Sequence, residues 1–117
     1  MTQNKRVINL SKNIMLADRV EVADTSFKRL KGLLGRRALE PGQGLIITPC
    51  NSIHTFFMRF PIDVVFLDKD YKVVAMAHSL PPARLFGSLL KAKQVIELPT
   101  GILKNTKTEL KDSIKIE

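Results

Sequence analysis

The sequence predicts an α+β fold: one compact domain with a curved, mixed or antiparallel, barrel-like sheet and one or two short helices. Three observations lead to this prediction. About seven or eight short apolar runs recur along the chain, separated by glycine, proline and polar turn residues. Clear helical periodicity is confined to one stretch. The 117 residues show no internal repeat and no second domain boundary, so residues 1–117 are predicted to form a single domain.

Two strands are predicted near the amino terminus, over residues 7–10 and 14–22, and the polar residues 11–13 connect them as a hairpin. Side chains alternate along an extended chain, so Leu16, Val20 and Val22 fall on the same face of the second strand. That face is largely apolar, as expected for a strand with one side on the core.

A helix is predicted next, because Asp24, Thr25 and Ser26 are favourable N-cap residues and apolar side chains then recur at helical spacing. The apolar stripe consists of Phe27, Leu30, Leu33 and Leu34. We expect this stripe to pack onto the sheet and Gly35 to follow the helix end in the left-handed conformation. The strongest positive cluster of the chain surrounds the helix and comprises Lys28, Arg29, Lys31, Arg36 and Arg37.

The later elements are predicted from short apolar runs and from the turns between them. Strands are expected at residues 45–47, 53–60, 62–67, 73–77, 94–98 and 113–116, with one helical turn within 102–112. The run 62–67 is apolar almost throughout, as in a strand that is covered on both faces. Residues 80–90 contain too much proline and glycine for a regular element and too many apolar side chains for an ordinary loop. We expect that segment either to cover the core or to meet a partner.

Composition excludes several classes of protein. Hydrophobic and charged contents of 44% and 26% are ordinary for a globular domain and argue against disorder. No segment approaches the roughly 20 apolar residues that span a bilayer, and no signal-peptide core is present, so we expect a soluble cytoplasmic protein without membrane contact. A lone cysteine, which cannot close an intramolecular disulfide, agrees with a reducing compartment. The net charge of +8 points to an anionic molecule or nucleic acid as a partner.

Side chains that could take part in catalysis or binding are concentrated in residues 49–63. Cys50 and His54 are four positions apart, about 6 Å in a helix but about 13 Å in a strand. If the turn-forming Asn51 shortens the gap, His54 could activate the thiol, with Asp63 or Asn51 orienting the imidazole. The alternative, which we prefer, is that Cys50 is a small buried hydrophobe and His54 is hydrogen-bonded within the fold.

A metal site and a cofactor are not expected. A structural or catalytic metal needs three or four ligands, and Cys50 with His54 supplies two. No spacing in the sequence brings in His78 or Asp63 to complete such a set.

The predicted strand 53–60 mixes apolar and polar residues on both faces. Alternation places His54 and Met58 on one face, whereas Thr55, Phe57 and Arg59 fall on the other. Such mixing fits a central strand whose polar groups are paired, or a strand with one face on a pocket. Aromatic and methionine side chains at this spacing belong more often to a core than to a ligand site.

Arg59 and Asp63 flank residues 60–62, and a proline bend there would bring their charges together. We prefer the interpretation that they form an ion pair that holds the turn. In a second interpretation, Arg59 acts with Arg84 and presents a guanidinium fork to a carboxylate or phosphate.

Several of these segments together resemble domain-of-unknown-function family 192, which consists of small bacterial and archaeal proteins. The segments are residues 32–36, 42–45, 49–68 and 97–101, and the similarity runs from about residue 20 to the carboxyl end. The resemblance implies a single compact α+β domain with a barrel-like sheet, and it implies no agreed activity. The signature positions of the family map onto Met58, Pro61, Ile62, Asp63, Phe66 and Asp68. With Cys50 and His54 upstream, the chain is similar to a branch that carries these two residues.

Our leading functional hypothesis is a small domain that binds a small anionic ligand or a partner in a cleft between residues 49–63 and 80–90. The expected ligand-binding residues are Asn51, His54, Thr55, Met58, Arg59 and Arg84. A rival hypothesis is a thiol-dependent enzyme, whose candidate catalytic residues are Cys50, His54 and Asp63. A third is non-specific nucleic-acid binding through the basic helix, although one tyrosine and no tryptophan leave few aromatic rings for stacking on bases.

Overall fold

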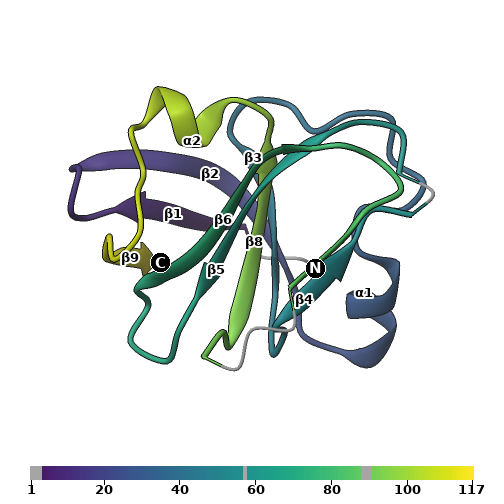
Figure 1. Cartoon of the computed structure of the whole chain (residues 1–117), viewed down its shortest axis with the longest axis horizontal. Coiled ribbons are helices and arrows are strands. Elements are labelled where there is room, and N and C mark those ends of the chain that lie inside the picture. The colour runs from purple at the N-terminus through teal and green to yellow at the C-terminus, as the bar shows by residue number, and fades with distance from the viewer. Residues whose placement is uncertain (1–3, 57, 88–90) are drawn as a thin grey trace.

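The computed structural model of the chain describes residues 4–56, 58–87 and 91–117. Nine strands and two short helices lie in these residues (Figure 1). Their bounds are β1 Lys5–Asn9, β2 Ile14–Ala23, α1 Ser26–Lys31, β3 Gln43–Ile47, β4 Ser52–His54, β5 Ile62–Leu67, β6 Val73–Leu80, β7 Leu85–Gly87, β8 Gln94–Pro99, α2 Ile102–Asn105 and β9 Ile114–Ile116. In the described part of the chain, no helix has the length and apolar character needed to cross a membrane.

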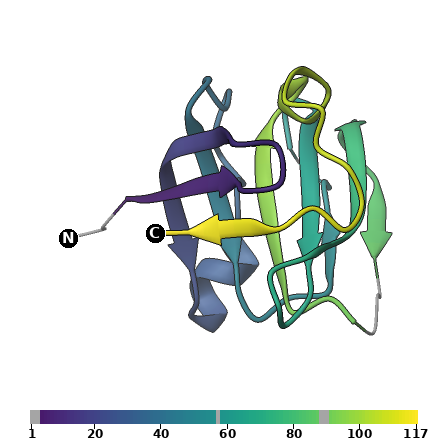
Figure 2. The same cartoon turned by 90° about the vertical axis from the view of Figure 1, so that its left-hand side faces the viewer.

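Seven strands form one mixed sheet in the order β6-β5-β8-β3-β2-β1-β9. Strands β2 and β3 are parallel, and the other neighbouring pairs are antiparallel. The sheet curls into a half-barrel (Figures 1 and 2), and an isolated antiparallel bridge between Lys72 and Ser113 brings the residue before β6 close to the residue before β9. The predicted α+β class, with a curved mixed sheet and two short helices, is confirmed.

Both faces of the sheet are buried. On one face, side chains such as Val7, Ile96 and Leu103 form a core cluster beneath α2. On the other, Val64 and Val95 belong to a second cluster that includes side chains from β4 and from the segment after α1. Every residue of β5 is buried, which confirms the prediction that this strand is covered on both sides.

Helix α1 is shorter than predicted and its packing differs. Thr25 caps its amino end as expected, but the helix ends at Lys31 with Gly32 as the C-cap at φ 49°. Phe27 and Leu30 are 74% and 73% exposed, so the prediction that the whole apolar stripe packs onto the sheet is wrong. Because the chain leaves the helix at Gly32, the first side chain of the stripe to reach the core is Leu33, beyond the helix.

The strand predicted at 53–60 is also shorter, because β4 ends at His54. Beyond it the chain turns, and the backbone N–H of Met58 donates to Thr55 O at 3.2 Å. The predicted alternation therefore does not extend past His54, and the part that concerns Phe57 lies outside the described residues.

Candidate functional site

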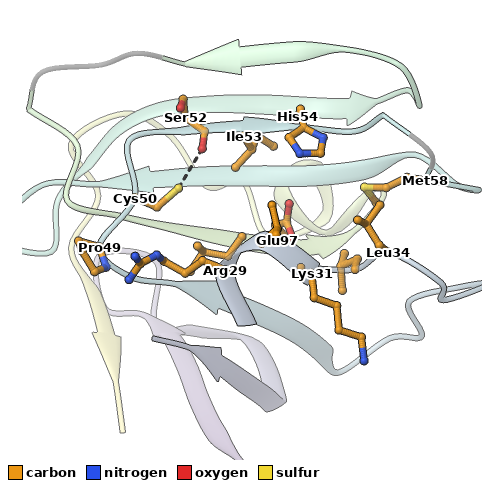
Figure 3. Close-up of a pocket in the computed structure, with 14 residues that line it drawn as sticks. Arg29, Lys31, Leu34, Pro49, Cys50, Ser52, Ile53, His54, Met58 and Glu97 are labelled. Carbon is orange, nitrogen blue, oxygen red and sulfur yellow. Dashed lines mark hydrogen bonds between the residues drawn. The ribbon is translucent and has the colours of Figure 1, made fainter. Parts of the chain in front are cut away.

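A pocket of about 140 Å³ lies between α1 and its following turn on one side and strands β3, β4 and β8 on the other (Figure 3). A cavity of ~150 Å³ is large enough to hold a benzene ring. Leu33, Leu34, Ile47, Ile53 and Met58 form the apolar part of its wall. The pocket is a recess beside the second core cluster, and its polar side chains are those of Arg29, Lys31, Cys50, Ser52, His54 and Glu97.

Glu97, on β8, is the most deeply buried polar group of this pocket. The residue is only 3% exposed, and its Oε1 atom has no hydrogen-bond partner in the described part of the chain. Burial raises the pKa of Glu97 to about 7, although the charge of Arg36 acts in the opposite direction. The Arg36 guanidinium donates instead to Glu21 Oε2 at 2.5 Å.

The position of Glu97 follows from strand alternation. Val95 and Glu97 point to the pocket side of the sheet, while Ile96 and Leu98 pack in the opposite cluster. Glu97 is not among the site residues predicted from the sequence. The available signal was a single carboxylate within an otherwise apolar strand, since buried carboxylates are rare without a partner or a function.

Arg29 approaches the pocket from α1. Figure 3 shows its side chain running beside Pro49 towards Cys50, whereas the side chain of Lys31 extends away from Glu97. Arg29 is half-buried, and no carboxylate pairs with it among residues 4–56, 58–87 and 91–117.

Cys50 and His54 line the same pocket, but the thiol does not bond to the imidazole. The Cys50 Sγ atom donates to the backbone oxygen of Ser52 at 2.9 Å. The His54 ring stacks on Phe56, with 5.5 Å between ring centroids. Burial raises the pKa of the half-buried Cys50 thiol and Glu97 raises it further, while the Ser52 hydrogen bond and Arg29 oppose them. This environment disfavours the thiolate that a nucleophile requires.

Asp63 does not line the pocket that contains Cys50 and His54. It is fully buried, and its two carboxylate oxygens accept the backbone N–H groups of Ser79 at 2.8 Å and Leu103 at 2.9 Å. The preferred interpretation of an Arg59–Asp63 ion pair is wrong, since no such pair forms and Arg59 is exposed.

Thr55 does not line the pocket, and its hydroxyl forms hydrogen bonds with backbone groups instead. Its hydroxyl donates to Pro81 O at 2.6 Å and accepts the backbone N–H of Arg84 at 2.9 Å. The Arg84 side chain is exposed, and its guanidinium donates to the backbone oxygen of the adjacent Ala83 at 3.3 Å. Of the expected ligand-binding residues, His54 and Met58 line the main pocket, while Asn51 lines a shallower hollow beside Cys50.

In the described residues, strands β4 and β7 lie side by side where a cleft between residues 49–63 and 80–90 was expected. Strands β4 and β7 pair in antiparallel register, with Ile53 opposite Phe86. The Phe86 ring also packs against Phe66, with ring centroids 5.5 Å apart. Residues 80–87 therefore cover the core, and residues 88–90 lie outside the described part. The pocket opens on the other side of β4, towards α1.

The basic cluster around α1 is not one uniform surface. Arg36 is engaged with Glu21, and Arg29 belongs to the pocket. Nucleic-acid binding through this cluster stays a prediction. Among residues 4–56, 58–87 and 91–117, no three His, Cys, Asp or Glu side chains gather closely enough to hold a metal ion.

Comparison with known proteins bears on the family. The model of the family DUF192, described as an uncharacterised ACR, matches residues 7–116. The chain belongs to this family. The match extends further towards the amino terminus than the resemblance from residue 20 suggested. Nothing in the comparison separates a DUF192 branch with upstream Cys and His, so that finer assignment stays a prediction.

Two archaeal relatives of the DUF192 chain are similar over almost their whole length. The UPF0127 protein of Pyrococcus horikoshii is 36% identical over 115 residues, which cover 93% of this chain and 96% of that protein. The UPF0127 protein of Pyrococcus abyssi is 39% identical over 115 residues, with coverage of 93% and 95%. These relatives are uncharacterised, so they establish the family and no activity.

Two solved bacterial structures share the DUF192 fold. A protein of unknown function from Novosphingobium aromaticivorans has a TM-score of 0.83 at 22% identity, covering 97% of this chain and 84% of that chain. A protein from Sinorhizobium meliloti has a TM-score of 0.83 at 21% identity, with coverage of 98% and 93%. At this level of identity the likeness shows the fold alone.

Proposed function

We propose that the domain binds a small anionic molecule in the pocket between α1 and strands β3, β4 and β8. The observation that carries this proposal is the half-buried Arg29, which lines the pocket without a carboxylate partner in the described residues. A guanidinium group presents a planar set of donors that matches a carboxylate or a phosphate. The net charge of +8 adds a long-range attraction for anions.

The shape and surroundings of the pocket support a small ligand rather than a macromolecule. Its volume of about 140 Å³ suits a group of a few carbon atoms, and its apolar walls provide hydrophobic contact with such a group. Glu97 lies within the pocket, so an anionic group is better accommodated near Arg29 than near Glu97.

The thiol-dependent alternative has weaker support. Cys50 lines the pocket, but its pKa is raised by burial and its hydrogen bond goes to a backbone oxygen. Burial stabilises the neutral thiol over the thiolate.

Titration with butyrate and with inorganic phosphate, followed through backbone amide chemical shifts, tests the proposal. We expect shifts at Ile53 and Met58, and no shifts at Leu103 on the opposite face of the sheet. Arg29→Gln should weaken butyrate binding about tenfold, because a charge-assisted hydrogen bond is lost. The matched control is Lys28→Gln, which removes the same charge from the same helix at a position that does not line this pocket.

Equal weakening in both variants would mean that only net charge matters and would contradict a site at Arg29. An absence of shifts around the pocket with either anion would overturn the proposal as a whole.

A further inference from the structure

The unpaired Oε1 atom of Glu97 gives more information about the chemical groups of the ligand than Arg29 does. Oε1 is an acceptor inside a pocket, without a donor in the described part of the chain. Buried acceptors are nearly always satisfied, by protein, by water or by a ligand. An unsatisfied acceptor in a residue that lines a pocket is a candidate partner for a ligand donor.

We propose that the ligand is a small zwitterion, an inference that rests on the function proposed above. Its N–H donor, most simply a primary ammonium, binds Glu97, and its anionic group binds Arg29. A short apolar chain joins the two groups. The two charged side chains come from different elements, Glu97 from β8 and Arg29 from α1. Both line the same pocket, as Figure 3 shows.

Charge balance favours an ammonium over the other donors. Arg36 is the positive side chain that acts electrostatically on Glu97, but Arg36 already pairs with Glu21. A second anion beside Glu97 would be repelled, and an apolar group there would leave Oε1 unpaired. A hydroxyl could donate to Oε1 without balancing its charge, whereas an ammonium does both.

The apolar part of the pocket wall favours a linking chain without polar groups. Leu33, Leu34 and Ile53 belong to this part of the wall, and none of the three offers a polar side-chain atom. A linker of a few methylene groups satisfies these contacts and fits a volume of about 140 Å³. Short amino carboxylates and amino phosphates share this chemistry.

Three probes of similar length separate the contributions of the two ends. Butyrate carries the anion alone, butylamine carries the ammonium alone, and γ-aminobutyrate carries both. Their dissociation constants are measured by amide chemical-shift titration on the wild-type chain and on Glu97→Gln, which preserves the shape of the side chain and removes its charge. We expect γ-aminobutyrate to bind the wild type about tenfold more tightly than butyrate, the effect of one hydrogen bond to a charged group.

In Glu97→Gln, γ-aminobutyrate should lose most of this advantage over butyrate, whereas butyrate itself should bind at least as well as before. Arg29→Gln serves as a matched control, because it should weaken both compounds in parallel and leave their ratio unchanged. The amide spectra of unliganded Arg29→Gln and Glu97→Gln check that both variants keep the backbone fold of the wild type.

Each of the other binding results would refute one or both of the proposals. Equal affinity of butyrate and γ-aminobutyrate for the wild type would refute the zwitterion and leave the anionic-ligand proposal standing. Equal affinity of butylamine and γ-aminobutyrate would refute the anionic group, and with it both proposals. Absence of binding by all three probes would also refute both.

Discussion

The carboxylate of Asp63 accepts the backbone N–H of Leu103 at 2.9 Å, so a residue of β5 caps the first turn of α2 from forty positions away. Helix α2 begins after Gly101 and has no side-chain cap of its own. The other carboxylate oxygen accepts the backbone N–H of Ser79 near the end of β6. Asp63 therefore joins three elements on one side of the half-barrel, and it does so while fully buried.

Asp63→Ala should lower the free energy of unfolding by about 2–4 kcal/mol, because a buried and a partly buried N–H group lose a charged acceptor. Urea unfolding of the wild type and the variant measures the difference. The matched control, Asp24→Ala, removes an exposed carboxylate and should change stability by less than about 0.5 kcal/mol. Unchanged stability together with loss of butyrate binding would instead make Asp63 a site residue.

Much of the fold could be predicted because its signals are local. Apolar content alone identified β5, and the polar residues 11–13 separated the first two predicted strands, which correspond to β1 and β2. The parallel pairing of β2 with β3 had no local signal, because it depends on how α1 and the loop after it return the chain. The sheet order likewise depends on contacts between distant strands.

The limits of β4 illustrate a non-local effect. Its sequence continues with residues that favour a strand, yet the chain turns after Thr55. The hydroxyl of Thr55 binds Pro81 and Arg84, which are 26 and 29 positions away, and local alternation contains no information about them. The same holds for the pocket: alternation could place Glu97 on a strand face, but only the fold shows its oxygen without a partner.

Thr55→Val should lower the free energy of unfolding by about 2 kcal/mol, because the N–H of Arg84 and the carbonyl of Pro81 lose their partner while the side-chain volume is preserved. The amide proton of Arg84 should then exchange faster with solvent. Thr55→Ser retains the hydroxyl and should lose much less stability. Equal effects of the two substitutions would assign the contribution to the methyl group rather than to the hydrogen bonds.

Glu97 should make the protein less stable as pH rises. Its pKa is about 7 in the folded chain against an ordinary value of 4.5, so the folded state retains a proton that the unfolded state has lost. This contribution is fully present below pH 4.5, is lost as pH rises through about 7, and amounts to about 3 kcal/mol. Glu97→Gln cannot lose the proton, so its stability should not share this fall.

Urea unfolding at several pH values between 4 and 8 checks this prediction through the difference between the wild type and Glu97→Gln, which cancels the titration of all other groups. Parallel curves for the two proteins would mean that Glu97 ionises in the folded chain as readily as in the unfolded one.

Cys50 should react slowly with iodoacetamide at neutral pH. Burial holds the pKa of its thiol above the ordinary value of 9.0, so the reactive thiolate is scarce below that pH. We expect a rate at pH 7.5 about tenfold below that of a cysteine in a short peptide, and a rise only at more alkaline pH. Because the charge of Glu97 contributes to the raised pKa, Glu97→Gln should increase the rate modestly. A thiol that titrates below pH 7 would favour the alternative in which Cys50 is a nucleophile.

Leu33, just beyond helix α1, should contribute more to stability than the apolar residues of the helix itself. Phe27 is 74% exposed, whereas Leu33 is 2% exposed within the core cluster. Phe27→Ser should change the free energy of unfolding by less than about 0.5 kcal/mol, because little apolar surface is buried and the two residues have similar helix propensities. Leu33→Ala should cost about 2–5 kcal/mol by leaving a cavity. Urea unfolding measures both changes in the free energy of unfolding. A loss in Phe27→Ser as large as that in Leu33→Ala would show that the helix packs its apolar stripe onto the core, as the sequence predicted.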